Sequence, residues 1–100
     1  MYSNKANINL LTAHLIAHDI RDIVVCPGSR NAPIVHNLYE AGSKFQLYPI
    51  TDERSAAFVA IGLWIKRKRP IAICVTSGSA LLNCLPGIAE AAFRHIPLVM

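Results

Sequence analysis

The chain has 100 residues, which is enough for one domain with a modest hydrophobic core. Apolar residues make up 53% of it, more than is usual in globular domains, so we expect some apolar surface to meet another domain or subunit. The formal net charge is +4, and the sequence has neither the run of about 18 apolar residues that a membrane span needs nor a basic leader before an apolar block. We therefore expect a soluble protein without a membrane span.

The cysteine content points to the same kind of protein. Cys26, Cys74 and Cys84 are an odd number without paired spacing. Two of them lie within apolar runs, where a free cysteine behaves as a small hydrophobic residue. A reducing cytoplasm is the compartment that fits best.

The first expected element is a helix over 5–18, where apolar residues recur at helical spacing and Ser3 or Asn4 can serve as the cap. His14 and His18 stand four residues apart on it, a spacing that can hold a metal ion. No third ligand follows at a suitable spacing, so we interpret them as surface or half-buried histidines and expect no metal site.

A buried strand and a tight loop come next. Asp22–Cys26 is a β-branched run without polar alternation, as expected for a strand that is covered on both faces of a parallel sheet. The loop Pro27–Pro33 then leads into a pattern of helical period that starts at Ile34. In open α/β sheets ligands bind at this carboxyl edge. Arg30 in the loop can bind a carboxylate through two hydrogen bonds, although a surface salt bridge explains it equally well.

A second strand over 45–50 runs into a helix over 52–68 that begins with acidic residues. The pattern alone is explained if Thr51 or Asp52 caps this helix and Glu53 complements the positive end of its dipole. First-turn carboxylates are ordinary signals of a helix start. A functional role for Glu53 therefore needs support from outside this segment.

The same helix ends in the basic cluster Lys66–Arg69, directly before Pro70. Cations complement the negative end of the helix dipole, and proline stops the helix. A nucleic-acid surface is the alternative, but no aromatic residues interleave with the cluster and no second basic cluster accompanies it. We expect no nucleic-acid partner.

The last third of the sequence predicts a strand, a helix and the beginning of another strand. The run 71–75 has almost no polar residue and should be central in the sheet, and Thr76–Ser79 turns the chain at its end. The helix over 80–94 contains Pro86–Gly87, which predicts a bend or a late start. Pro97 opens a fourth apolar strand that stops with the chain, so we expect the natural protein to continue.

Helices and strands alternate throughout, which predicts a three-layer α/β fold with a parallel sheet and helices on both faces. The carboxyl ends of parallel strands meet at one edge of the sheet, so Arg30, Glu53 and Ser77 should converge there. This convergence favours a functional role for Glu53. The sequence has no G-x-G-x-x-G and no G-K-[ST] motif, so it does not encode a direct phosphate cradle of either kind.

Three loops carry a family resemblance: Cys-Pro-Gly-Ser-Arg-Asn-Ala-Pro at Cys26–Pro33, Thr-Asp-Glu-Arg-Ser-Ala at Thr51–Ala56, and Thr-Ser-Gly-Ser-Ala-Leu-Leu-Asn at Thr76–Asn83. Together with Pro86 and Glu90 they resemble the N-terminal pyrimidine-binding domain of thiamine diphosphate enzymes, and among these the carboligating synthases of menaquinone biosynthesis. The resemblance runs from about residue 5 to the end of the chain. It implies a flavodoxin-like fold in which residues 1–100 are the N-terminal part of the pyrimidine-binding domain.

The resemblance also implies a set of cofactor-binding residues. The glutamate that matches Glu53 hydrogen-bonds the aminopyrimidine ring of the cofactor and promotes deprotonation of its thiazolium carbon, so Glu53 is the expected catalytic residue. A carboxyl group held in an apolar cleft can share a proton in this way because burial disfavours its charged form. The other residues that match the cofactor site are Pro27, Thr76, Ser77, Gly78 and Asn83.

The implied substrates are isochorismate and 2-oxoglutarate. The resemblance places Ser29, Arg30 and Asn31 at the substrate carboxylates, and it implies a Mg²⁺ and diphosphate site in a domain that these residues do not include. It further implies a homodimer or homotetramer with the cofactor at the subunit interface, so the 100 residues alone should be inactive. Asn31 stands where serine is common, and Ser79 where threonine is usual.

Two kinds of alternative remain open from the sequence. One is another thiamine diphosphate enzyme that acts on 2-oxoacids, such as an acetolactate synthase or a decarboxylase. The other is a non-catalytic α/β module that binds an anion or mediates dimerisation.

Overall fold

The alternating pattern of the sequence is realised as four strands separated by helices. The computed structural model describes residues 3–100. The strands are β1 (Asp22–Val25), β2 (Gln46–Pro49), β3 (Ile71–Cys74) and β4 (Leu98–Val99). The helices are α1 (Ala6–Ala17), α2 (Ala32–Glu40), α3 (Glu53–Arg67), α4 (Ser79–Asn83) and α5 (Leu85–Phe93), with a 3₁₀ turn, η1 (Gly42–Lys44), before β2.

The strands form one parallel sheet in the order β2-β1-β3-β4. The runs without polar alternation, β1 and β3, are the two inner strands, as their sequences predict. The outer strand β2 contains Pro49, which lies beside Val25. Proline lacks the N–H that an inner strand would need, so this edge position is where it is tolerated. The strand order and the flanking helices confirm the flavodoxin-like α/β fold.

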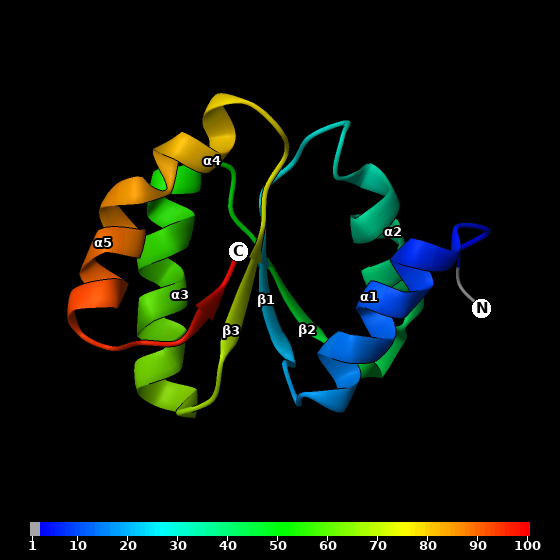
Figure 1. The fold of residues 1–100 in the computed structure, drawn as a ribbon, viewed down its shortest axis with the longest axis horizontal. Helices are drawn as coiled ribbons and strands as arrows, with labels where there is room; N and C mark the ends of the chain where they lie inside the picture. The colour runs from blue at the N-terminus through cyan, green and yellow to red at the C-terminus, as the bar shows by residue number, and fades with distance from the viewer. Residues whose placement is uncertain (1–2) are drawn as a thin grey trace.

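Helices cover both faces of the sheet, as Figure 1 shows: α1 and α2 lie on one side, and α3, α4 and α5 on the other. Alternate residues of β1 serve the two faces. Ile23 and Val25 pack with α1 and α2, whereas Val24, like Cys26 directly after the strand, packs with α3. The sheet is therefore the middle of three layers, with one core on each of its faces.

The predicted break in the last helix is confirmed, and it falls at Cys84. This residue ends α4 and caps α5, and Pro86 occupies the first turn of α5, where its missing N–H costs nothing. Gly87 then lies against Ala57 of α3 so closely that a Cβ on the glycine would overlap the alanine side chain. The break thus turns α5 onto α3 at short range.

The prediction that Ser3 or Asn4 caps the first helix is wrong. Lys5 occupies the cap position, and its side chain makes no capping hydrogen bond. The Oγ of Ser3 accepts a hydrogen bond from the Lys5 N–H instead, because Ser3 is held to Asn9 by its backbone N–H and carbonyl at 3.1 and 2.8 Å. These contacts hold Ser3 two positions before the cap residue Lys5, so its Oγ does not reach the first helical turn.

The basic cluster Lys66–Arg69 lies at the C-terminal end of α3, as the sequence predicts. Lys68 ends the helix in the left-handed conformation (φ 58°), with its Nζ 4.3 Å from the ring centroid of Trp64. Arg67 and Arg69 lie beside the buried carboxylate of Asp22, at 3.7 and 3.2 Å. Among residues 3–100, no helix combines the length and the apolar character that crossing a membrane requires.

Candidate functional site

The loops that follow β1 and β3 are in direct contact at the carboxyl edge of the sheet. The backbone of the two strands stays paired to this edge, where the Cys26 N–H donates to the Cys74 carbonyl at 2.9 Å. Just beyond, Gly28 lies against the side chain of Thr76, leaving no room for a Cβ. The strand order reverses between β1 and β3, which is where open α/β sheets bind their ligands.

Asn31 holds the loop after β1 in place through its buried side chain. Its Nδ2 donates to the Cys26 carbonyl at 2.8 Å and lies 3.7 Å from the Sγ of Cys74. The side chain is buried, and its Oδ1 has no hydrogen-bond partner among residues 3–100. The structure therefore turns the Asn31 amide inward, toward the strand ends, and away from the surface that Ser29 and Arg30 face.

Glu53 opens α3, and the capping role belongs to its neighbour. The carboxylate of Asp52 accepts hydrogen bonds from the backbone N–H and the hydroxyl of Ser55, at 2.9 and 2.8 Å, so the predicted cap is confirmed at Asp52. Glu53 is half-buried and makes no side-chain hydrogen bond within residues 3–100. Its carboxyl group is thus left available for a ligand.

The Glu53 carboxylate is close enough to the end of β1 to affect a buried thiol there. Burial, and after it the negative charge of Glu53, raises the pKa of Cys26 to about 11. Cys84, which is also buried, has a raised pKa for the same two reasons in the same order. The two thiols are therefore protonated at neutral pH.

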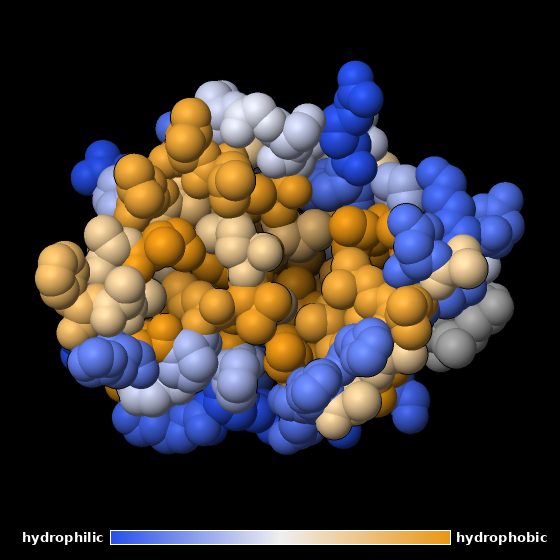
Figure 2. All heavy atoms as spheres, in the orientation of Figure 1, coloured by the Kyte–Doolittle hydropathy of each residue, from blue (hydrophilic) through white to orange (hydrophobic). Residues whose placement is uncertain are grey.

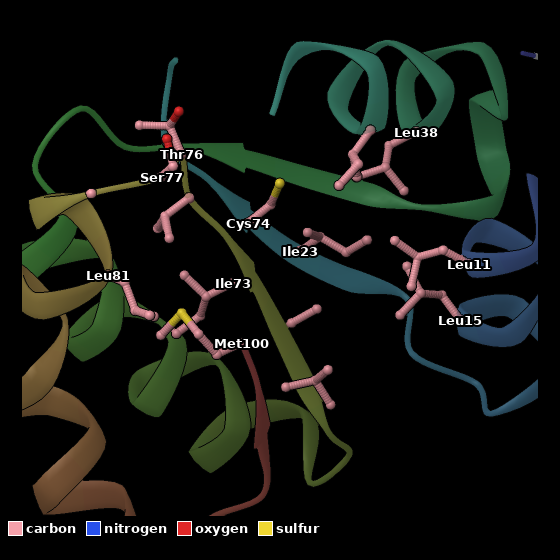
Figure 3. Close-up of a pocket in the computed structure, with 15 residues that line it drawn as sticks. Leu11, Leu15, Ile23, Leu38, Ile73, Cys74, Thr76, Ser77, Leu81 and Met100 are labelled. Carbon is pink, nitrogen blue, oxygen red and sulfur yellow. The ribbon is translucent and has the colours of Figure 1, made fainter. Parts of the chain in front are cut away.

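The loop after β3 contributes Thr76, Ser77 and Gly78 to the polar end of an apolar groove of about 540 Å³. Figure 3 shows Thr76 and Ser77 at one end of this groove and Leu11 and Leu15 of α1 at the other. Gly78 adopts a positive φ of 84°, and a Cβ there would meet no atom within 4 Å. The missing side chain keeps the polar end of the groove open. The remaining lining residues are Ile23, Ile34, Leu38, Ala72, Ile73, Cys74, Val75, Leu81, Val99 and Met100.

The other predicted site residues are spread over the same edge without meeting in one cavity. Pro27 lines a hollow of about 480 Å³ between β1, β2 and α2, and Ser29 lines a third hollow beside Lys5. Arg30 is exposed and forms no ion pair with any residue in the described range. Asn83 is exposed at the last position of α4. The structure joins the β1 and β3 loops closely but leaves Arg30 pointing to solvent.

Sequence reasoning assigned no site role to four residues that shape this edge: Gly28, His36, Thr51 and Cys84. Gly28 admits Thr76, and the Pro-Gly pair was the available signal for a close approach. His36 and Thr51 line the hollow beside Pro27. Cys84 contacts the Glu53 carbonyl, and its position in an apolar run gave no signal for such a contact.

Apolar side chains are exposed over much of the surface near the site. Figure 2 shows them gathered over α4 and α5 and around the central hollow. Phe93 is the extreme case, with 86% of its surface exposed. The large apolar residues that are exposed are Leu10, Leu11, Tyr39, Phe58, Ile65, Leu81, Leu82, Leu85, Phe93, Val99 and Met100. Their number is in line with the prediction of a partner surface, which stays a prediction.

The two histidines of α1 do not meet further candidate metal ligands. The rings of His14 and His18 stack on each other with centroids 6.1 Å apart. Within residues 3–100, no three His, Cys, Asp or Glu side chains lie together in a way that could hold a metal ion.

The geometry of this edge agrees with a family match over nearly the whole chain. Residues 8–100 match the model of the thiamine pyrophosphate enzyme N-terminal TPP binding domain. The chain belongs to the thiamine pyrophosphate enzymes. The matched model is that of an N-terminal domain, in agreement with the parallel α/β fold of residues 3–100.

Individual relatives narrow the comparison within the thiamine pyrophosphate enzymes. The chain is 55% identical over its full length to a 2-succinyl-5-enolpyruvyl-6-hydroxy-3-cyclohexene-1-carboxylate synthase of Phocaeicola vulgatus. It is 47% identical, over 96% of its length, to the synthase of the same name from Desulfotalea psychrophila. The chain spans 18% of the length of each of these two relatives.

Proposed function

We propose that the protein containing this chain is a 2-succinyl-5-enolpyruvyl-6-hydroxy-3-cyclohexene-1-carboxylate synthase. It decarboxylates 2-oxoglutarate with thiamine diphosphate and adds the succinyl semialdehyde unit to isochorismate, a transferase reaction of menaquinone biosynthesis. The observation that carries this proposal is the position of Glu53 as the half-buried first residue of α3, with the capping role taken by Asp52. The 55% identity to a synthase of this name supports the choice of reaction.

The residues at the carboxyl edge fit an aminopyrimidine ring. The groove joins a polar end, Thr76–Gly78, to apolar walls, which is the pairing that a heteroaromatic ring needs. Gly78 leaves open the space into which a side chain would project. Glu53 supplies a half-buried carboxyl group whose oxygens make no hydrogen bond within residues 3–100. A ring with a basic nitrogen can use that carboxyl group.

In this proposal the chain orients the cofactor and handles one proton. Glu53 would hold a proton between its carboxyl oxygen and the pyrimidine ring nitrogen. Thr76, Ser77 and Gly78 line the groove that would take the ring, and we assign Pro27 and Asn83, which lie outside this groove, to the same cofactor site. Bound thiamine diphosphate supplies the electron sink for decarboxylation.

The β1 loop recognises the substrate carboxylates. Arg30 is exposed without an ion-pair partner in the described range, so its guanidinium is free to form the two-pronged bond that carboxylates accept. Ser29 lies beside it and offers a hydroxyl. Asn31, which we also assign to this site, acts from its inward position by fixing the loop that carries the other two residues.

The remaining parts of the site belong to the rest of the protein, since the chain spans 18% of its longer relatives. We assign Mg²⁺ and the diphosphate group to a later domain and the exposed apolar surface to contacts with that domain or a second subunit. The cofactor lies at the interface of a homodimer or homotetramer in the cytoplasm, and residues 1–100 alone are inactive.

The test is isochorismate consumption by the natural full-length protein with 2-oxoglutarate, thiamine diphosphate and Mg²⁺. Wild type should turn over, and Glu53→Gln should lose about 10²-fold or more in kcat, the range expected for a general acid or base. Asp52→Asn is the matched control, because it removes the adjacent charge and keeps a capping side chain.

Each other outcome points to a defined alternative. Activity on pyruvate without isochorismate would identify another 2-oxoacid enzyme of the same family. Equal activity of wild type and Glu53→Gln would mean that Glu53 has no catalytic role and only complements the dipole of α3. Absence of turnover and of thiamine diphosphate binding would favour a non-catalytic anion-binding or dimerisation module.

A further inference from the structure

Cys84 lies at the joint between α4 and α5, fully buried, with its thiol directed at the first residue of α3. We propose that Cys84 is a positioning residue for Glu53. The inference rests on the proposed role of Glu53 and adds the means by which its backbone is held. The Cys84 thiol touches the Glu53 carbonyl, so it acts through the backbone and contacts no substrate.

The contacts of the thiol are specific. Its Sγ lies 3.5 Å from the Glu53 carbonyl oxygen and 3.6 Å from the carbonyl oxygen of Ala80. The second contact is the local one that a helical cysteine makes with the residue four positions earlier. The first joins two elements that are 31 residues apart in sequence. A thiol is a weak donor with a single proton, which these two carbonyl oxygens share, and the contact with Glu53 is the one that links α3 to the joint between α4 and α5.

A close contact between α5 and α3, one turn after Glu53, also holds the start of α3 in place. Gly87 in the first turn of α5 lies against Ala57, and a side chain on the glycine would overlap it. In the α-helical pattern, Ala57 is also the residue whose N–H donates to the Glu53 carbonyl. That carbonyl is therefore held on one side by its own helix and on the other by Cys84. With the carbonyl fixed, the direction in which the Glu53 side chain leaves the backbone is fixed as well.

Cys84 also connects two of the loops that form the site. It directly follows Asn83 and ends the helix that begins beside Gly78. Through the thiol contact, the segment Thr76–Asn83 and the start of α3 are fastened to each other. Burial raises the pKa of Cys84, so the group remains a neutral thiol that can donate. A change at Cys84 should thus loosen Glu53 relative to the groove.

The experiment compares Cys84→Ala, Cys84→Ser and the control Ile61→Val in the natural full-length protein. Ile61 packs on Ala91 two turns further along α3, so its shortening weakens the same helix pair without touching the Glu53 carbonyl. The first readout is hydrogen exchange of the Ala56 and Ala57 amides in the protein without cofactor. Cys84→Ala should speed this exchange about fivefold, the size expected from the loss of one hydrogen bond.

The second readout separates positioning from general loss of stability. Cys84→Ala should lower kcat about tenfold and leave the KM for isochorismate within about twofold, because a displaced carboxyl group affects the reacting geometry more than substrate binding. Cys84→Ser should recover most of both effects, since its hydroxyl keeps a donor. Ile61→Val should change neither the exchange of these amides nor kcat by more than about twofold.

Three outcomes would overturn the inference: wild-type exchange in Cys84→Ala, equal effects in Ile61→Val, or a serine variant that behaves like alanine. Its failure is distinguishable from failure of the proposed function. If wild type does not consume isochorismate, the proposed function fails while the exchange readout still tests Cys84. If wild type is active and Cys84→Ala exchanges as wild type does, only the positioning role fails.

Discussion

Thr76 fills the space that a side chain on Gly28 would need. A Cβ at Gly28 would lie only 2.7 Å from the Thr76 Oγ1, and closer still to the Thr76 Cβ. The atoms that would clash include a rigid branch point, so neither loop can yield without moving backbone. The contact joins the ends of β1 and β3 at the point where the strand order reverses.

Gly28→Ala should therefore destabilise the protein. We expect a loss of about 1–3 kcal/mol in the free energy of unfolding, the usual range for overpacking, measured by urea denaturation. Gly62→Ala is the matched control, because Gly62 lies in α3 with no atom within 4 Å of an added Cβ. That variant should gain about 0.5–1 kcal/mol from reduced chain entropy. Equal effects of the two changes would show that the Gly28 contact is not tight.

Arg30→Ala should weaken substrate use more than turnover. The exposed guanidinium makes no ion pair within residues 3–100, so its removal should cost little stability and should raise the KM for substrate by about tenfold or more at an unchanged thiamine diphosphate affinity. Steady-state kinetics in the full-length protein give both constants. Arg54→Ala, an exposed arginine next to Glu53, is the control for a general loss of positive charge. An unchanged KM in Arg30→Ala would remove Arg30 from the substrate site.

The hydrogen bonds of Asp52, which caps α3, should make the free energy of unfolding depend on pH in the acidic range. The backbone N–H of Ser55, and after it the Ser55 hydroxyl, holds the pKa of Asp52 below its ordinary value of 3.8. A lowered pKa means that the stabilisation is complete above that ordinary value and is lost as the pH falls through the lowered one. Asp52→Asn keeps a capping side chain but cannot titrate.

The measurement is the free energy of unfolding of wild type and Asp52→Asn across about pH 2 to pH 6. The difference between the two proteins should be constant at the upper end of this range and should shift against wild type at the lower end. Parallel curves throughout would mean that the Asp52 hydrogen bonds do not form in solution.

Asp22 should be important for stability although it lies at the opposite edge of the sheet from the site. Its side chain is 1% exposed and accepts hydrogen bonds from the Tyr48 hydroxyl at 3.0 Å and from the Arg69 Nε at 3.2 Å. Asp22→Asn should lose about 1–3 kcal/mol, because it removes the buried charge that pairs with Arg67 and Arg69 and replaces one of the two acceptor oxygens by a donor.

The control for Asp22 is Asp19→Asn. Asp19 pairs with Arg21 at 2.8 Å in an exposed position, and such pairs contribute about 0–1 kcal/mol. Urea denaturation of both variants gives the comparison. Equal losses would indicate that the burial of Asp22 adds nothing to its ion pairs.

Much of the fold follows from the sequence because its signals are local. The β-branched runs at Asp22–Val25 and Ile71–Cys74 have no polar alternation, and both are inner strands. Pro86 divides the last helix, as proline must, although the division falls two residues earlier, at Cys84. The N-cap of α3 was also readable, since Asp52 precedes the helical pattern directly.

The parts that could not be read depend on contacts between segments that are distant in sequence. Nothing near Ser3 indicates that Asn9 would draw it away from the first turn of α1. The inward turn of Asn31 depends on the Cys26 carbonyl and on Cys74 of the neighbouring strand. The resemblance predicted which loops form the site, which stays a prediction, and only the packed structure shows that Gly28 meets Thr76.

The short strand β1 has the Asp22 network at its first residue and the proposed cofactor edge beyond its last, Val25. Four residues of extended chain span roughly 10 Å, the separation at which the effects of two substitutions become additive. A stabilising substitution near Asp22 can therefore offset a destabilising one at the proposed cofactor edge. Homologues adapted to different temperatures should differ around Asp22, Arg67 and Arg69 while the loops at the other end keep their chemistry.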